Sequence, residues 1–339
     1  MKHRRCSGDV DVIVVPRERY TATVDDLRKL LSTIPNDTRV IVIRGGMPER
    51  VIRRVRALGD GRIEIVGPSR HLGPNSARAI GLDVATAKYV AFVDNDVETS
   101  PGWLDALRLA AVEHDAWVVR PVVLQRIGDT TTVHEAGGTC HLDNDGHVTT
   151  LVETHRYLGC PVSDVATLVP EAVEMFEFHA VLFDRARLLA LGGLDQEMLT
   201  QGEHLDLCLR ISNAGGRVWF EPRVQVTYVI PARIEVRDLS FFLGRWARSR
   251  NESTRKNFVT KHRVTNTTDL HETWLFAELH RSYAWLPLGR AVATLMRRPI
   301  AGGVAKRFDR YVGWLIAEAI VRIAPRWRSG GRAQVLHRS

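Results

Sequence analysis

The segment from Lys88 to Asp96 reads KYVAFVDND, an apolar run that leads directly into two carboxylates. A short apolar run bounded by polar residues is typical of a parallel strand covered on both faces. Ligand sites of α/β sheets lie at the carboxyl ends of the strands, so we expect Asp94 and Asp96 at such a site. Mg²⁺ is often held by one or two carboxylates, with water and substrate phosphate completing its octahedron. The pair therefore predicts a metal site, whereas the alternative is a solvated turn.

The composition describes a globular chain with an excess of positive charge. The 339 residues are 45% hydrophobic and 25% charged, and the formal net charge is +8. This balance favours an anionic partner, such as nucleotide phosphates, anionic lipid headgroups or nucleic acid. The four cysteines show no Cys-x-x-Cys spacing, which favours a reducing compartment. We expect a cytoplasmic protein, because the first apolar run is too short for a signal peptide and no uninterrupted apolar stretch reaches the roughly 18 residues of a membrane span.

Strands and helices alternate along the first hundred residues. Strands are predicted at residues 10–15, 39–43, 62–66 and 88–96. Helices are predicted between them at residues 21–34, 48–58 and 74–84. Such alternation with short loops predicts an α/β fold, with a mostly parallel central sheet and helices on both faces. Further strands are predicted at residues 116–123 and 178–183, a hairpin at residues 133–151 and a surface loop at residues 159–173.

A second group of polar side chains lies between Glu203 and Arg210. This segment is predicted to begin a helix that ends at Gly215-Gly216. Glu203, Asp206 and Arg210 stand at i, i+3 and i+7, so they share one face of that helix. Such a face is a place for a proton acceptor, and the alternative is a solvated face whose acids pair with the helix dipole.

Taken together, the motifs resemble glycosyltransferase family 2, whose members have the GT-A fold. The motifs are, in order, the strand that ends at Pro16, the Gly-x-x-x-Ala-Arg element at residues 73–78, the Asp-Asn-Asp at residues 94–96, the Gly-Gly-Leu-Asp at residues 192–195 and the helix from Glu203 to Arg210. The resemblance covers residues 10–231. It implies a nucleotide-sugar-binding domain over residues 1–232, followed by a basic, amphipathic helical extension over residues 233–339.

The resemblance also implies a chemistry. It implies a nucleoside-diphosphate-sugar donor, a divalent metal (Mn²⁺ or Mg²⁺), a carbohydrate, lipid-linked or small-molecule acceptor, and usually inversion at the anomeric carbon. Asp94 and Asp96 would hold the metal, and Asp94 would also bind the ribose and diphosphate. Further substrate-binding positions implied by the resemblance are Pro16, Arg78 and Arg210. The helix from residue 203 would supply the base, with His204, Glu203 and Asp206 as the catalytic set.

Two adjacent residues compete for the role of base. Successive helical residues point about 100° apart, so Glu203 and His204 are not expected to serve one acceptor equally. The positive end of the helix dipole lowers the basicity of Glu203 and disfavours the imidazolium form of His204. We therefore expect a neutral His204 that accepts the proton, at the position where the resembling family has an Asp, with Glu203 as the alternative.

Three positions depart from the pattern of the family. Residues 44–46 read Arg-Gly-Gly, where the family often has an acidic segment that contacts the nucleobase. Glu203-His204 replaces the usual Glu-Asp pair. Tyr228 stands where a His often helps to hold the metal, and we therefore expect weaker metal binding. Two rival functions stay open: a nucleotidyltransferase on a related sheet, and a non-catalytic sugar-nucleotide-binding protein, which these departures favour.

The segment after residue 232 is both apolar and basic. Aromatic and aliphatic residues recur at roughly helical spacing, with arginines and lysines beside them. One interpretation is an interfacial surface that lies on an anionic leaflet and places the protein at the inner face of the membrane. The other is a helical appendage whose aromatic residues are core. Nucleic-acid binding is not predicted, because the chain contains no recognised module for it.

Overall fold

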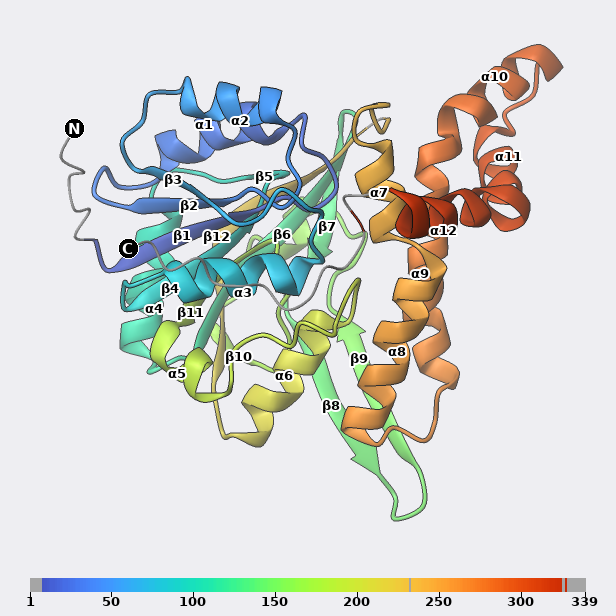
Figure 1. Cartoon of the computed structure of the whole chain (residues 1–339). Coiled ribbons are helices and arrows are strands. Elements are labelled where there is room, and N and C mark those ends of the chain that lie inside the picture. Colours follow the sequence, from blue (N-terminus) through green and yellow to red (C-terminus); the bar gives the residue numbers. More distant parts are fainter. Residues whose placement is uncertain (1–7, 232, 325–326, 328–339) are drawn as a thin grey trace.

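The structure is a computed structural model that describes residues 8–231, 233–324 and 327, and it consists of a sheet-centred body with a helical arm (Figure 1). The first strands are β1 (Val10–Val15), β2 (Arg39–Ile43), β3 (Ile63–Val66) and β4 (Tyr89–Asp94). The helices between them are α1 (Thr23–Thr33), α2 (Glu49–Arg56) and α3 (Pro74–Val84). The alternation predicted from the sequence is therefore confirmed.

Both faces of the sheet are covered, and the side chains of β1 show how. Val12 and Val14 pack in one core with α1 and α2, whereas Ile13 and Val15 pack in a second core with α3. Successive strand residues point to opposite faces, so a strand covered on both sides must be apolar throughout. All six residues of β1 and all six of β4 are buried.

One mixed sheet runs in the order β10-β12-β6-β11-β4-β1-β2-β3. Its other strands on this path are β6 (Val118–Ile127), β10 (Glu171–Val173), β11 (Ala180–Asp184) and β12 (Val218–Ile230). β4 pairs in parallel with β1 and antiparallel with β11. Val15 is in register with Asp94, so the chain leaves β1 and β4 at the same edge of the sheet. This edge is the one at which the sequence predicts a ligand site.

The middle of the chain differs in part from the prediction. A hairpin forms from β8 (Gly138–Asn144) and β9 (Thr149–His155), within and just beyond the predicted range of residues 133–151. However, β7 (Thr130–Glu135) belongs to the main sheet, where it pairs with β6. The predicted loop at residues 159–173 contains a 3₁₀ turn (Val162–Val165) and β10, which pairs with β12. The strand escaped prediction because only three residues form it, too few to show periodicity.

Three helices and a short strand complete the body. They are β5 (Val97–Glu98), α4 (Trp103–Glu113), α5 (Arg185–Ala190) and α6 (Glu203–Asn213). α6 follows Gly202, whose φ of 80° is in the left-handed region that favours glycine. Leu205, Cys208 and Leu209 of α6 are buried in the same core as α3. The predicted helix at this position is confirmed.

The described residues after 232 are mainly helical, as predicted for the extension. It comprises α7 (Leu239–Arg245), α8 (Arg248–His262), α9 (Thr268–Arg281), α10 (Leu286–Met296), α11 (Ala301–Phe308) and α12 (Trp314–Ile323). α10 and α11 project away from the sheet, whereas α8 runs beside the β8–β9 hairpin (Figure 1). No helix of residues 8–231 and 233–324 is both long and apolar enough to cross a membrane. The predicted domain boundary falls at residue 232, which lies outside the described residues.

Candidate active site

The carboxyl end of β4 is pinned to the chain that follows β1. The backbone N–H of Asn95 donates to the carbonyl of Val15 at 3.0 Å, and its side-chain oxygen accepts from the N–H of Arg17 at 2.9 Å. Its amide nitrogen donates to Thr23 Oγ1 at 2.8 Å. Because Asn95 is occupied by these structural bonds, Asp94 and Asp96 on either side of it are held in fixed positions.

Arg78 connects Asp94 to the helix that contains the candidate bases. Its guanidinium donates to Asp94 Oδ1 at 3.1 Å and to Glu203 Oε1 at 3.2 Å. The side chain of Arg78 is only 1% exposed and lies over the ring of Phe178. Buried charges of this kind are stable when each is paired and hydrogen-bonded. The structure thus brings three predicted site residues, from α3, β4 and α6, into one contact.

Asp96 is buried without a partner. Both of its carboxylate oxygens are inaccessible and make no hydrogen bond within the described residues. Burial raises the pKa of Asp96 to about 7, since it outweighs the opposing effect of the Arg17 cation. The hydroxyl of Tyr228 is likewise buried without a partner, and Tyr228 pairs with Val97, the residue after Asp96. An unpaired carboxylate of this kind suits a cation, so these residues fit the predicted divalent metal.

His204 lies beside a carboxylate that the sequence did not indicate. Its Nε2 is 3.8 Å from Oε1 of Glu153 on β9, and its side chain is 15% exposed. Burial lowers the pKa of His204, but the nearby carboxylates of Glu153 and Glu177 raise it by more, and the net result is a raised pKa. The downward shift expected from the helix dipole alone is the wrong direction, because that expectation left out these carboxylates.

Asp206 and Arg210 have structural partners. Asp206 is fully buried, lies 2.8 Å from Nε2 of His262 and forms ion pairs with Lys261 at 2.8 Å and with Arg210 at 3.3 Å. Arg210 also donates to the carbonyl of Leu191 at 2.5 Å. These contacts explain both side chains without a substrate. The catalytic role of Asp206 and the substrate contact of Arg210 stay predictions, as does the role of Pro16, which is buried after β1.

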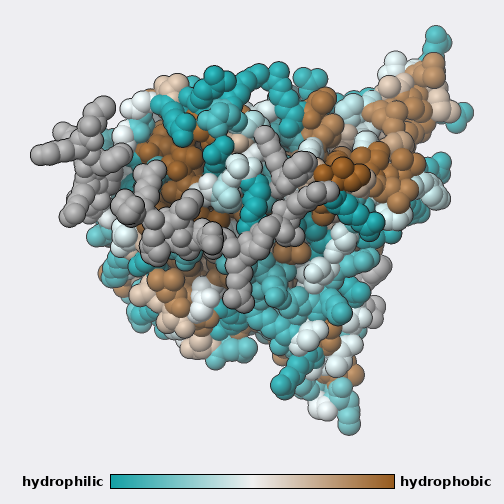
Figure 2. Space-filling view, viewed as in Figure 1, coloured by the Kyte–Doolittle hydropathy of each residue, from teal (hydrophilic) through white to brown (hydrophobic). Residues whose placement is uncertain are grey.

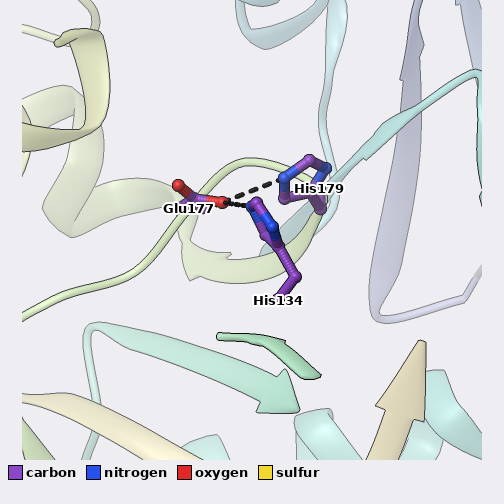
Figure 3. A group of neighbouring side chains, drawn as sticks. All are labelled: His134, Glu177 and His179. Atoms are coloured by element: carbon purple, nitrogen blue, oxygen red, sulfur yellow. Dashed lines mark hydrogen bonds and ion pairs between the residues drawn. The ribbon is translucent and has the colours of Figure 1, made fainter. Parts of the chain in front are cut away.

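Several polar residues at the site were missed by the sequence analysis. Arg17 lies 3.6 Å from Asp94 Oδ2 and over the ring of Tyr228. Its position directly after Pro16 was a signal that could have been used. His134, Glu177 and His179 form a further cluster, in which both histidines point toward the one carboxylate (Figure 3). His134 lies 43 positions before Glu177 in the chain, so no local spacing reveals the group of three.

Comparisons with known proteins find a partial match to one family model and a likeness in fold. Residues 13–158 match the family model described as glycosyl transferase family 2. The pre-mycofactocin glycosyltransferases of two strains of Mycobacterium tuberculosis are each 27% identical over 232 residues, which are 68% of this chain and 44% of the relative. The chain therefore spans less than half the length of these curated relatives.

A solved structure shows a likeness in fold. The crystal structure of GalNAc-T7 with UDP, GalNAc and Mn²⁺ matches with a TM-score of 0.51 and 16% identity, over 86% of this chain and 57% of that chain. At this identity the match concerns the fold alone. The predicted fold class, an α/β sandwich with a mostly parallel sheet and a helical extension, is confirmed.

Proposed function

We propose that this chain, of which residues 13–158 match the model of glycosyl transferase family 2, transfers a sugar from a nucleoside-diphosphate sugar to an acceptor hydroxyl. One observation supports this most directly: Arg78 pairs with Asp94 at the end of β4 and with Glu203 on α6. A proposed donor-binding carboxylate, Asp94, and a candidate base, Glu203, thereby contact one guanidinium. Glycosyl transfer needs both, because a diphosphate must leave while a hydroxyl loses its proton.

Asp94 and Asp96 are the residues that would hold Mn²⁺ or Mg²⁺. The unpaired, buried oxygens of Asp96 support this assignment. When bound, such an ion neutralises the charge that develops on a leaving diphosphate. Arg17 and Arg78 both stand at Asp94 and add positive charge of their own. Because Tyr228 replaces a histidine ligand, we expect metal binding weaker than with a full ligand set.

His204 is the proposed base. Its Nε2 faces Glu153, which leaves Nδ1 to accept the proton from the acceptor hydroxyl. The hydroxyl oxygen forms a bond to the anomeric carbon as the bond from that carbon to the diphosphate oxygen breaks. Attack opposite the leaving group in a single displacement inverts the anomeric configuration. Glu203 is the alternative base, although one of its oxygens is already bound to Arg78.

The name of the curated relatives makes pre-mycofactocin one acceptor to test. The other classes of acceptor to test are carbohydrates, lipid-linked molecules and small molecules.

The arm, which comprises the helices from Leu286 to Ile323, is the proposed contact with an anionic membrane surface. Its helices expose large apolar side chains, including Leu295 at 85%, Tyr311 at 71% and Ile323 at 69%. Apolar residues gather on the arm in the space-filling view (Figure 2). Exposed arginines and a lysine lie beside them, namely Arg297, Arg298, Lys306, Arg307, Arg310 and Arg322. An apolar face flanked by basic residues is typical of helices that lie in the headgroup region. We therefore propose peripheral attachment at the inner face of a membrane.

Nucleotide binding followed by product analysis tests the enzymatic proposal. We expect UDP or GDP to raise the melting temperature, and to raise it further with Mn²⁺, because ligands that bind only the folded state stabilise it. UDP- and GDP-sugars should then release a nucleoside diphosphate in the presence of an acceptor. Release of pyrophosphate would indicate a nucleotidyltransferase instead, and binding without turnover on any acceptor would indicate a sugar-nucleotide-binding protein.

A further inference from the structure

A cluster of two imidazoles and one carboxylate lies beside the candidate active site. The Nε2 atoms of His134 and His179 are each 2.9 Å from Oε2 of Glu177. All three potential ligand atoms lie within 4.8 Å of one another. His134 comes from β7, and Glu177 and His179 come from the segment just before β11 (Figure 3). The side chains of His134 and Glu177 are each 16% exposed, whereas that of His179 is buried.

The surroundings of His134 resemble those of a metal ligand. Its Nδ1 lies 3.3 Å from the amide oxygen of Gln125, which accepts a hydrogen bond from a protonated Nδ1. Histidines that bind metals usually donate the other ring N–H to an oxygen in this way, because the bond fixes the tautomer and the ring orientation. Nε2 of His134 is then the nitrogen that faces Glu177.

The local charge favours a cation. Glu135 is fully buried beside this cluster and pairs with Arg120 at 3.0 Å. Glu153 and Glu177 flank His155, at 3.0 Å and 4.0 Å from its ring nitrogens. In these contacts Glu135 pairs with an arginine, whereas Glu153 and Glu177 face histidines, which carry a positive charge only when protonated. Buried negative charge of this kind is costly unless it is paired, protonated or bound to a metal.

We propose that His134, Glu177 and His179 form a binding site for a borderline transition-metal ion such as Zn²⁺, separate from the carboxylate pair Asp94 and Asp96. Imidazole nitrogens and a carboxylate oxygen suit Zn²⁺, whereas Mg²⁺ prefers oxygen ligands. Ligand atoms about 2.0–2.1 Å from a tetrahedral ion are roughly 3.3 Å apart, so the two 2.9 Å contacts need to open by only a few tenths of an ångström. Three protein ligands leave the fourth position open.

Arg17 is the group that such an ion must displace. Its NH1 lies 2.7 Å from Nδ1 and 3.2 Å from Nε2 of His179, so the guanidinium stands at the edge of this ring. The same nitrogen is 3.6 Å from Oδ2 of Asp94. A metal on Nε2 of His179 repels the guanidinium, which can turn toward Asp94. Removal of the Arg17 charge should therefore strengthen metal binding.

Metal titration of the full chain tests this site. The protein carries no histidine tag, is treated with a chelator beforehand, and is titrated with no nucleotide or acceptor present. The parent should bind Zn²⁺, and Co²⁺ in its place should give visible absorption bands. Glu177→Gln, which keeps the shape of the side chain, should weaken Zn²⁺ binding by more than the roughly 10–100-fold that loss of an outer-shell partner costs. The matched control is Glu171→Gln, which removes a carboxylate that pairs with Arg156 instead. This variant should bind Zn²⁺ as the parent does.

Two further variants separate this site from the candidate active site. Asp96→Asn should retain the Zn²⁺ affinity of the parent, and Arg17→Met should increase it roughly tenfold. His134→Gln repeats the ligand test should thermal unfolding show that Glu177→Gln is not folded. The proposal is overturned by a parent that binds no Zn²⁺ at tens of micromolar or by ligand variants that bind as the parent does. Equal losses in Asp96→Asn and Glu177→Gln also overturn it, because they indicate one shared ion.

Discussion

Nε2 of His262 on α8 lies 2.8 Å from Oδ1 of Asp206 on α6, and this contact joins the helical extension to the helix of the candidate bases. Lys261 reaches the same oxygen at 2.8 Å. The side chain of Asp206 is 1% exposed, so the pairing occurs inside the protein. The extension therefore helps to position α6, whatever else its outer surface binds.

Removal of this contact should destabilise the protein and slow turnover. We expect His262→Ala to lower the free energy of unfolding by about 1.5–3 kcal/mol, the range for a hydrogen bond to a charged group. Lys261 and Arg210 remain to pair with Asp206, so the protein should still fold. Thermal unfolding and the rate of nucleoside diphosphate release measure the two effects. His147→Ala, at an exposed turn position, is the control, and equal stability of the two variants would contradict the role of His262.

The same carboxylate predicts a change of stability with pH. Burial raises the pKa of Asp206, but hydrogen bonds from His262 and Lys261 outweigh it, and the net pKa lies below the ordinary 3.8. A carboxylate with a lowered folded pKa stabilises the protein above its unfolded pKa, and this contribution is lost as the pH falls toward the folded pKa. Asp206→Asn should therefore be less stable than the parent at pH 7, and the difference should shrink below about pH 4. Urea unfolding at several pH values measures it, and a difference independent of pH would contradict the assignment.

Asp96→Asn tests the metal assignment. Asn keeps the size of the side chain but lacks the charge that a divalent ion needs. We expect Mn²⁺ to increase the affinity of the parent for a nucleoside diphosphate and to have no such effect on the variant. Calorimetric titration with and without Mn²⁺ gives both affinities, and Asp105→Asn on the exposed part of α4 is the matched control. An equal Mn²⁺ effect in variant and parent would show that Asp96 is not a ligand.

The site residues that could be predicted from the sequence are those whose role follows from the segment in which they lie. Asp94 and Asp96 follow a buried strand directly, and Glu203 begins a helix with a clear apolar face, so local pattern was sufficient for each. The pairing of Arg78 with both Asp94 and Glu203 depends on how α3, β4 and α6 pack. No local pattern contains that information.

The error about His204 has the same origin. The helix dipole is a local feature, and it was the only field that could be derived from the sequence. Glu153 lies on β9, fifty-one positions earlier in the chain, and only the folded hairpin brings it beside His204. At the buried ring this carboxylate raises the pKa, because a charge in a poorly solvated site interacts strongly.

Vesicle binding tests the surface of the arm. The parent should co-sediment with vesicles that contain anionic lipid and should be released by salt, because surface attraction is screened over a Debye length of roughly 8 Å at physiological ionic strength. Leu295→Glu together with Tyr311→Glu should weaken binding, whereas Leu109→Glu, on α4 and 56% exposed, should not. Binding that does not depend on lipid charge, or that survives the double substitution, would contradict a membrane-binding role. The arm would then be a helical appendage that packs on the sheet domain.

Turnover measurements on α6 variants decide which residue accepts the proton. His204→Ala should lower turnover by roughly 10²-fold or more, the usual loss when a general base is removed, with unchanged affinity for the nucleoside diphosphate. Because the net pKa of His204 is raised above 6.5, the rate of the parent should fall on the acid side with a midpoint above that value. Glu153→Gln removes the nearest carboxylate, so it should shift this midpoint to lower pH, an effect not expected if His204 is only structural. If His204→Ala keeps near-full turnover while Glu203→Gln loses it, the base is Glu203.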